Sequence, residues 1–223
     1  YWIRYSRTLP EHTRRIYNAI SDEYFVIDPD RSKVREELGI PKDGRLAIYV
    51  GRLAAFKGID TVLDAFNPIL EQENLYLLYV GLPDLSVKGT KEMLHKMEQR
   101  IANNSWGDRV RFLGYRKDVP RLMASSDILV HPTQIEGFGL VLAEAMAVDL
   151  PVVASNVEGI PEVLDGTDSI MLPSDDSKAL REAVMKTLNR TPKEAAQAII
   201  KGRKRAEDFR MEKRIDIILR YFH

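Results

Sequence analysis

The sequence contains no cysteine, which excludes disulfide bridges, thiolate nucleophiles and Cys-ligated metal sites. It has no excess of charge, because 33 basic and 33 acidic residues cancel, and this argues against a general nucleic-acid or anionic-membrane surface. It has no apolar run near the roughly 20 residues that span a bilayer. These absences leave an ordinary globular protein, for which we expect a cytoplasmic location.

Short apolar runs alternate with amphipathic stretches along most of the 223 residues. The runs are rich in Val, Ile and Leu on consecutive positions, which is typical of parallel strands covered on both faces. Strands are predicted over residues 46–51, 75–81, 109–114, 127–132, 151–155 and 169–173. Helices are predicted over residues 58–70, 90–103, 119–126, 138–147, 160–164, 176–189 and 192–222. The alternation indicates an α/β fold with a doubly wound parallel sheet, in which ligands bind at the carboxyl ends of the strands.

The beginning of the chain fits this alternation less well. Residues 14–20 are interpreted as one more strand, and residues 32–38 as a short helix that ends at Gly39. The sequence begins with Tyr1 instead of Met, and we interpret it as a fragment of a longer protein. The predicted division is a linker with a lead-in strand (1–41), a Rossmann-like domain (42–190) and closing helices (191–223).

A loop with two glycines precedes one of the predicted helices, in the stretch EGFGLVLAEAMA (136–147). Gly137 and Gly139 let a ligand approach the main chain, and the free N–H groups of a helix's first turn attract anions. We predict a phosphate at the N–H groups of Gly139, Leu140 and Val141. The alternative is a tight turn whose glycines serve packing only, since glycine patterns are weakly specific.

Two glutamates flank this loop, Glu136 before the glycines and Glu144 inside the predicted helix. A carboxylate does not bind a phosphate dianion, but it accepts hydrogen bonds from the hydroxyl groups of a sugar. A nucleoside diphosphate sugar has the matching layout of ribose, diphosphate and hexose. We therefore predict that the glutamates bind sugars and that the main chain between them binds phosphate. For Glu144 the alternative is a solvated helix position.

Two cations belong to the same predicted edge of the sheet, in the stretch GRLAAFKG (51–58). Gly51 and Arg52 end a strand, and Lys57 precedes the next helix. Opposite charges about 4 Å apart interact by roughly 4 kcal/mol at a surface-like dielectric, enough to stabilise a leaving diphosphate. In FLGYRKDV (112–119) another strand ends at Gly114 and Tyr115, where the main chain could pair with a nucleobase. The alternative is an ordinary turn, since every strand must end in one.

These motifs together resemble the C-terminal domain of glycosyltransferase family 4, a group of retaining GT-B glycosyltransferases. The resemblance covers residues 14–222 and rests on GRLAAFKG, FLGYRKDV, HPTQIEGFGLVLAEAMA, PVVAS and GIPEVLDG in this order. By this resemblance three residues are catalytic: Arg52 and Lys57 hold the donor diphosphate, and Glu136 binds hydroxyls of the transferred sugar. Glu144 would hold the ribose. The predicted donor-binding residues, with Tyr115 and Arg116 near the base, are Gly51, Tyr115, Arg116, Gly137, Phe138, Gly139, Leu140, Val141 and Glu144.

The resemblance also implies an activity. A sugar would pass from a nucleoside diphosphate donor, a UDP-sugar ahead of GDP-mannose and ADP-sugars, to an acceptor hydroxyl with retention of configuration. No cofactor and no bound metal are expected. The acceptor, a glycan, lipid or small molecule, would bind a second domain whose end lies in residues 1–41. The 223-residue chain alone is therefore expected to bind the donor and to transfer little or no sugar.

Three positions depart from the family's pattern. Asp149, Glu158 and Ser169 each stand where the family usually has glycine. Glu158 is the most consequential of these, because an added carboxylate near the sugar site would alter the choice of donor.

Other functions fit fewer residues. The D-x-D of FVIDPD (25–30) is also found in metal-dependent GT-A enzymes, but a Pro-containing loop explains it better. GFGLVLA has the wrong glycine spacing for a dinucleotide site of an oxidoreductase. A non-catalytic nucleotide-sugar-binding module on the same fold stays open. The four histidines have no metal-ligand spacing, and His131 is interpreted as structural. The basic run at 201–205 is interpreted as a solvated helix face, with attachment to a membrane's cytoplasmic face as the lesser alternative.

Overall fold

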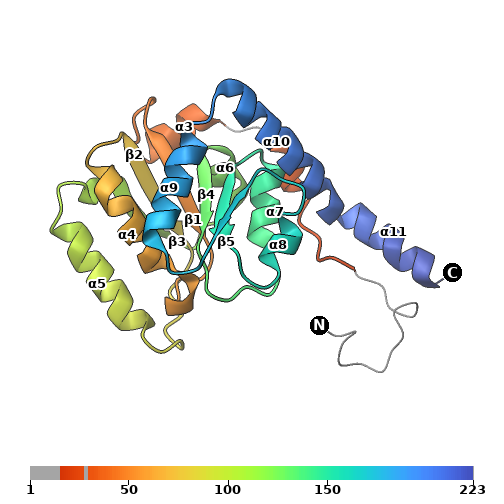
Figure 1. Ribbon diagram of the computed structural model, residues 1–223, viewed down its shortest axis with the longest axis horizontal. Coiled ribbons are helices and arrows are strands. Elements are labelled where there is room, and N and C mark those ends of the chain that lie inside the picture. The colour runs from red at the N-terminus through yellow and green to blue at the C-terminus, as the bar shows by residue number, and fades with distance from the viewer. Residues whose placement is uncertain (1–15, 28–29, 223) are drawn as a thin grey trace.

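A six-stranded parallel sheet forms the centre of the molecule (Figure 1). The structure is a computed structural model that describes residues 16–27 and 30–222. Neighbouring strands pair in the order β3-β2-β1-β4-β5-β6, all in parallel. The strands are β1 (Arg45–Val50), β2 (Leu75–Val80), β3 (Val110–Gly114), β4 (Ile128–His131), β5 (Val152–Ser155) and β6 (Ile170–Leu172). This order is that of a doubly wound, Rossmann-like sheet, and the predicted fold class is confirmed.

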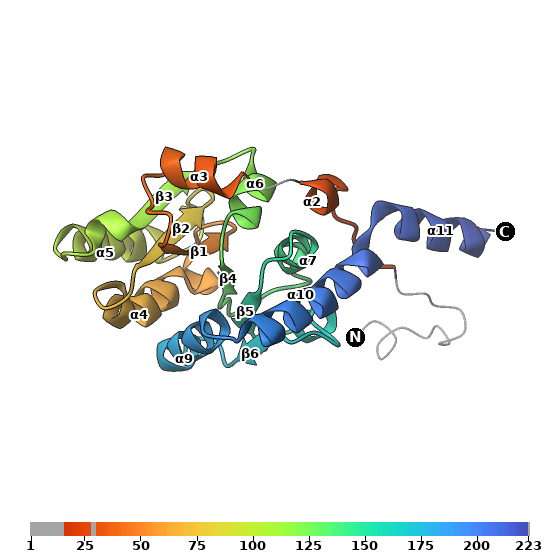
Figure 2. The ribbon, with the colours of Figure 1, turned by 90° about the horizontal axis from the view of Figure 1, so that it is seen from above.

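Helices cover both faces of the sheet (Figure 2). One face packs against α4 (Ile59–Leu70), α5 (Thr90–Ala102) and α9 (Ser177–Leu188). The other packs against α2 (Glu23–Val26), α3 (Arg31–Glu37), α6 (Val119–Ala124), α7 (Leu140–Ala147), α8 (Ile160–Val163) and the end of α10 (Pro192–Ala206). The remaining elements are α11 (Met211–Phe222) and the short 3-10 turns η2 (Ala55–Lys57), η3 (Gly107–Arg109) and η4 (Glu207–Phe209).

The central strand β1 shows why its sequence is apolar on consecutive positions. Leu46 and Ile48 are fully buried in the core on one side of the sheet. Ala47 and Tyr49 are fully buried in the core on the other side. Side chains alternate across a strand, so a strand covered on both faces needs apolar residues at every position.

The sheet also places the candidate site. The chain leaves β1 toward β2 and β3, and then returns to the other side of β1 as β4. The connections after β1 and β4 therefore run in opposite directions from one point, the topological switch point at which open α/β sheets bind ligands.

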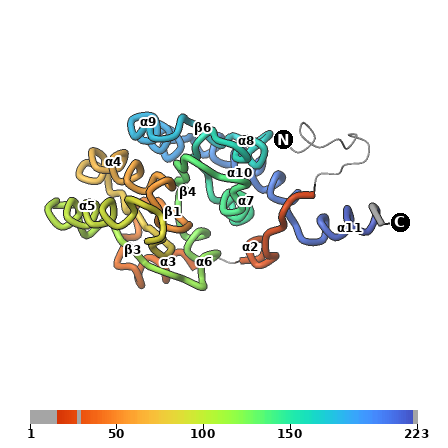
Figure 3. The backbone as a smooth tube through the Cα atoms, turned by 90° about the horizontal axis from the view of Figure 1, so that it is seen from below, coloured from red at the N-terminus to blue at the C-terminus, as the bar shows by residue number. Residues whose placement is uncertain are grey.

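The prediction of a single helix over residues 192–222 was wrong. The chain forms α10, the turn η4 and α11, and Arg210 between the last two has an extended main chain with φ −66° and ψ 145°. Phe209 is buried in the same core as β1, and turning this ring inward ends the straight helix. Beyond this bend α11 projects away from the sheet (Figure 3).

The prediction of a lead-in strand over residues 14–20 was also wrong for the residues that the structure describes. Residues 14 and 15 lie outside the described residues, and among residues 16–20 only Ile20 forms a bridge, with Arg210. The segment passes beside the end of α10, not beside a sheet edge, so it has no strand to pair with. The division at residue 42 stays a prediction, although Val34 and Leu38 before it lie in the core with Leu46. In the described ranges, none of the helices has the length and apolar character to cross a bilayer.

Candidate functional site

Three loops meet at the carboxyl edge of the central strands. Gly51, which follows β1, donates its N–H to the carbonyl of Val80 at 3.0 Å, and this bond ties the end of β1 to the end of β2. The loop after β4 is tied to η2, since the N–H of Gln134 donates to the carbonyl of Phe56 at 2.9 Å. Residues far apart in sequence therefore share this edge, as the strand pattern predicted.

Lys57 and Glu136 form an ion pair at the centre of this edge. The Nζ of Lys57 lies 2.8 Å from Oε2 of Glu136 and also 3.4 Å from the carbonyl oxygen of Ile135. The side chains of Lys57 and Glu136 are 12% and 19% exposed, so the pair is shielded from most of the solvent. The predicted diphosphate cation and the predicted sugar carboxylate are thus in direct contact.

His131, the last residue of β4, holds the same carboxylate. Its Nε2 lies 3.1 Å from Oε2 of Glu136, and its ring stacks on Tyr49 with centroids 6.1 Å apart. The imidazole is buried, and its Nδ1 has no hydrogen-bond partner in the described protein. Sequence reasoning gave His131 a structural role, and its contact with Glu136 followed no sequence signal.

These contacts fix the charge of Glu136. The hydrogen bond from His131, and after it the contact with Lys57, lower the pKa of Glu136 to about 2, against the opposing effect of burial. The carboxylate is therefore ionised at neutral pH and acts only as a hydrogen-bond acceptor. Because Oε2 receives both contacts, Oε1 is the oxygen left for a ligand hydroxyl.

Arg52 has a separate carboxylate partner, Asp84 in the loop after β2. The Nη1 of Arg52 lies 2.6 Å from Oδ2 of Asp84, and the arginine side chain is 65% exposed. Asp84 is itself held in place, since Ser86 donates its hydroxyl to Oδ1 at 2.5 Å and Asp84 donates its own N–H to Leu53 at 2.9 Å. Hydrogen bonds from Ser86 and the charge of Arg52 lower the pKa of Asp84. The sequence analysis did not find Asp84.

The glycine loop has the geometry of a helix start. Gly139 precedes α7 with φ 84°, a left-handed conformation that favours glycine, so the helix begins at Leu140 and not at the predicted Phe138. The N–H of Leu142 already bonds the carbonyl of Gly139 at 3.0 Å. The N–H groups of Leu140 and Val141 come before it, in the part of a helix where N–H groups lack an internal partner.

Phe138 has a packing role inside this loop. Its ring lies 5.7 Å from both Tyr17 and Phe209, measured between centroids. The side chain therefore anchors the loop to the core, and only the main chain of Phe138 is left for the predicted ligand contact. Around Gly137 there is open space, since a Cβ built there would meet nothing within 4 Å.

Glu144, inside α7, has a different partner from the Lys57–Glu136 pair. It points toward α2, where a hydrogen bond with Tyr24 stabilises its charge, and burial as the larger effect raises its pKa. Burial and the nearby Glu144 charge raise the pKa of Tyr24 in turn. Glu144 is half-buried, so it is not the fully solvated helix position of the alternative interpretation. Its role toward a ribose stays a prediction.

The two residues predicted near the base differ in what they contact. Tyr115 is 67% exposed at the end of β3. The guanidinium of Arg116 is bound by Asp118 at 2.8 Å and by Glu37 at 2.9 Å, and these carboxylates raise its pKa. Arg116 is thus held in a salt-bridge network with α3, whereas Tyr115 is free to contact a ligand.

Two of the three departures from the family's glycines have left-handed backbones. Asp149 has φ 62° and Glu158 has φ 42°, conformations that cost non-glycine residues roughly 1 to 2 kcal/mol each. Glycine at such positions avoids that cost. Glu158 additionally accepts a hydrogen bond from the N–H of Glu136 at 2.8 Å. Ser169 does not have a positive φ.

Two other candidates are set aside. Of the D-x-D motif, Asp28 lies outside the described residues, and Asp30 caps α3 by accepting from the N–H of Lys33 at 3.0 Å. Within the described ranges no group of three or more His, Asp or Glu residues is placed to hold a metal ion.

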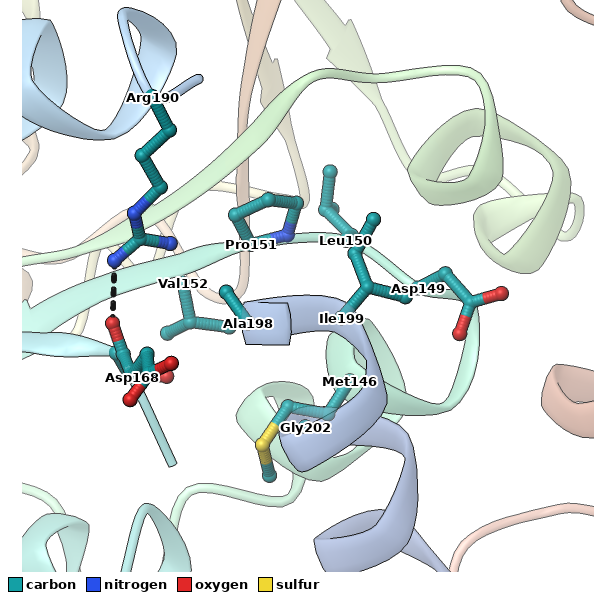
Figure 4. Close-up of a pocket in the computed structure, with 11 residues that line it drawn as sticks. Met146, Asp149, Leu150, Pro151, Val152, Asp168, Arg190, Ala198, Ile199 and Gly202 are labelled. Carbon is teal, nitrogen blue, oxygen red and sulfur yellow. Dashed lines mark hydrogen bonds between the residues drawn. The ribbon is translucent and has the colours of Figure 1, made fainter. Parts of the chain in front are cut away.

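A cavity of about 20 Å³ lies between α7, β5 and α10 (Figure 4). Apolar side chains line it together with Asp149, Asp168, Ser169 and Arg190, whose guanidinium donates to the carbonyl of Asp168 at 2.5 Å. Pro151 and Val152 line it where β5 begins. It therefore lies at the amino ends of the strands, away from the site above.

The fold and this cluster of loops define the class: a doubly wound α/β protein with a polar candidate site at its switch point. The chain matches the family described as glycosyl transferases group 1 over residues 30–205, and it belongs to this family.

Among curated proteins, it is 33% identical over 155 residues to an N-acetyl-alpha-D-glucosaminyl L-malate synthase of Bacillus anthracis, which covers 69% of the chain and 38% of the relative. It is 30% identical over 179 residues to a D-inositol 3-phosphate glycosyltransferase of Streptomyces bingchenggensis, covering 77% of the chain and 39% of that relative. The matched region thus spans well under two thirds of these relatives.

Solved structures of glycosyltransferases share the fold. HepE of Anabaena, solved in complex with UDP and glucose, superposes with a TM-score of 0.81 at 26% identity, over 93% of this chain and 55% of HepE. Sucrose-phosphate synthase of Thermosynechococcus elongatus gives a TM-score of 0.80 at 28% identity, over 99% of this chain and 54% of that one. The expected Rossmann-like half of a GT-B glycosyltransferase is thereby confirmed.

Proposed function

We propose that this chain is the donor-binding part of a retaining glycosyltransferase that takes its sugar from a nucleoside diphosphate, with UDP as the nucleotide. One observation carries the proposal: Lys57 and Glu136, 79 residues apart in sequence, meet at 2.8 Å beside the amino end of α7. A cation, an ionised carboxylate and free main-chain N–H groups are the three features that a sugar diphosphate requires. UDP is favoured because the similar HepE was solved with UDP and glucose.

In this proposal the diphosphate lies against the N–H groups of Leu140 and Val141, with Lys57 and Arg52 beside it. The ammonium of Lys57 contacts Glu136 and the carbonyl of Ile135, and its third proton is left for a phosphate oxygen. As the bond from the anomeric carbon to the diphosphate breaks, negative charge grows on the leaving group. Cations and N–H dipoles already fixed in position stabilise that charge without reorganising.

Glu136 contributes to the sugar side. Its carboxylate, held by His131 and Lys57, accepts hydrogen bonds from hydroxyls of the transferred hexose and fixes the anomeric carbon relative to the diphosphate. Glu144 accepts from the ribose, and Tyr115 lies near the base. These side chains and N–H groups provide the stabilisation without a metal or a cofactor. The acceptor binds elsewhere in the whole protein, so the 223-residue chain binds donor but transfers little sugar.

Calorimetric titration with UDP, GDP, ADP and their glucose conjugates tests the proposal. We expect UDP and UDP-glucose to bind most tightly, and Lys57→Met to weaken UDP by about ten-fold, as loss of one charged phosphate contact implies. Lys186→Met, which removes an exposed lysine of α9, serves as the matched control and should leave the affinity unchanged. Absence of binding by every nucleotide in millimolar titrations would refute the proposed function.

A further inference from the structure

Glu158 is bonded to the main chain of the proposed sugar-binding residue. Its Oε2 accepts the N–H of Glu136 at 2.8 Å, and the N–H of the next residue, Gly159, donates to the carbonyl of Glu136 at 3.3 Å. The loop after β4 and the loop after β5 are packed closely: a Cβ on Gly159 would lie 2.3 Å from the carbonyl oxygen of Gly137. The carboxylate of Glu158 is therefore fixed beside the residue that receives the sugar hydroxyls.

The charge of Glu158 is not balanced as that of Glu136 is. Glu136 has Lys57 at 2.8 Å and His131 at 3.1 Å. In the described part of the chain, no lysine, arginine or histidine forms an ion pair with Glu158. The sugar side of the site thus contains two carboxylates and one ammonium, and the surplus negative charge is that of Glu158.

Glu158 also occupies the main-chain N–H group of Glu136, which could otherwise bind an anion. The N–H of Glu136 precedes the glycine loop, and free N–H groups in such loops bind anions. Here this N–H already donates to the Glu158 carboxylate. A sugar carboxylate at this position would meet a negative charge in place of a free donor.

We propose that Glu158 is a specificity-determining residue that excludes donor sugars carrying a negative charge, and that the donor sugar is an uncharged hexose. The inference rests on the proposed function, since it assumes that a nucleotide sugar binds at Glu136. UDP-glucose and UDP-glucuronate are suitable probes, because their sugars differ only by a hydroxymethyl or a carboxylate at C6. Like charges a few ångströms apart near a protein surface lower affinity by about ten-fold or more.

A purely structural role for Glu158 predicts that its charge does not affect the choice of donor sugar. If the side chain only anchors the loop, any acceptor at the same place would serve, and charge would be irrelevant. Glu158→Gln separates the two roles, because the amide oxygen still accepts from Glu136 whereas the charge is lost. Glu158→Gly is a second variant that fits the left-handed backbone at φ 42° without strain.

Asp175 offers a matched control. It too is an acidic residue with a left-handed backbone, φ 61°, and its carboxylate accepts from the side chain of Gln134, in the same loop as Glu136, at 2.9 Å. Asp175→Asn therefore removes an equal charge from an equivalent contact. If the total negative charge of the region sets the choice of sugar, removing either charge should change it. If the position of Glu158 sets the choice, only the Glu158 variants should change it.

The experiment is calorimetric titration of the wild-type chain and these variants with UDP, UDP-glucose and UDP-glucuronate at 50 mM salt. The wild type is expected to bind UDP-glucose about ten-fold more tightly than UDP-glucuronate. Glu158→Gln and Glu158→Gly should each reduce this ratio at least three-fold, and Asp175→Asn should preserve it. Circular dichroism checks that each variant is folded.

The outcomes distinguish the two proposals. If the wild type does not bind UDP, the proposed function fails. If it binds UDP and both sugars equally well, only the inference about Glu158 fails. An unchanged ratio in both Glu158 variants, or an equal change in Asp175→Asn, would also overturn the inference.

Discussion

The ion pair between Lys57 and Glu136 leads to a quantitative prediction about stability. We consider Lys57→Met, Glu136→Gln and the double variant. Methionine keeps much of the aliphatic volume of lysine, and glutamine keeps the shape of glutamate and one acceptor oxygen. Each single change leaves the other member of the shielded pair without its partner, whereas the double change removes both charges. The difference between these effects is the coupling energy of the pair.

The magnitude follows from the pKa of Glu136. A fall from the ordinary 4.5 to about 2 corresponds to roughly 3 kcal/mol of stabilisation of the charged form. The hydrogen bond from His131 is the larger cause, and the side chain of Glu136 keeps 19% exposure to water. We therefore assign Lys57 a coupling energy of about 1 to 2 kcal/mol, above the typical value of an exposed pair. Losing this energy lowers the melting temperature by about 2 to 8 °C in a chain of this size.

Urea unfolding of the four proteins, followed by circular dichroism, measures the coupling energy. The pKa of Glu136 is lowered by folding, so its contribution to stability is present above pH 4.5 and is lost as the pH falls from 4.5 toward 2. The coupling should therefore be full at pH 7, partly retained at pH 3, and small only once the pH falls to about 2 and below. If the two single effects simply add at pH 7, within about 0.5 kcal/mol, the pair is not coupled and our account of the site's electrostatics is wrong.

Three further predictions concern other parts of the site. Asp84→Asn removes the negative charge beside Arg52, so UDP should bind about three-fold more tightly in low-salt calorimetry, and weaker binding would contradict this. Gly139→Ala forces a left-handed Cβ to within 3.0 Å of Leu142, so urea unfolding should show a loss of about 1 to 2 kcal/mol. Burial raises the pKa of Glu144, so that its ionisation costs stability as the pH rises above 4.5; Glu144→Gln should melt higher than the wild type at pH 8 but not at pH 4.

The strands were predictable because burial on both faces requires apolar residues at consecutive positions, and the sequence has such runs. Leu46 to Tyr49 are fully buried, and no other pattern of sequence fits a strand covered on both faces. The start of α7 was predicted two residues too early, because Gly139 is compatible with either side of a helix boundary. The bend at Arg210 was not predictable, since the helical periodicity continues through it and only the burial of Phe209 explains the turn.

The candidate site was predictable in its location but not in its contacts. The carboxyl ends of parallel strands meet at one edge, so Lys57 and Glu136 were expected there from the strand pattern. Their direct ion pair, and the contact of His131 with the same oxygen, depend on how the loops fold back over the sheet. Asp84 gave no signal at all, because a single aspartate after a strand is an ordinary turn residue.

Those contacts change how a diphosphate is expected to bind. Lys57 is paired with Glu136 and Arg52 with Asp84, and the four charges sum to zero, so the site does not attract the donor through an excess of positive charge. The pairs leave hydrogen-bond donors available, however, since one ammonium proton of Lys57 is unused and Arg52 contacts Asp84 through Nη1 alone. A diphosphate can therefore add to both pairs without breaking them, and the carboxylates keep each cation pointed at the same place. Under the proposed function, the site would recognise its ligand by the direction of its donors, with the free N–H groups of α7 completing the set. Its two acidic partners would then lower affinity while they improve orientation.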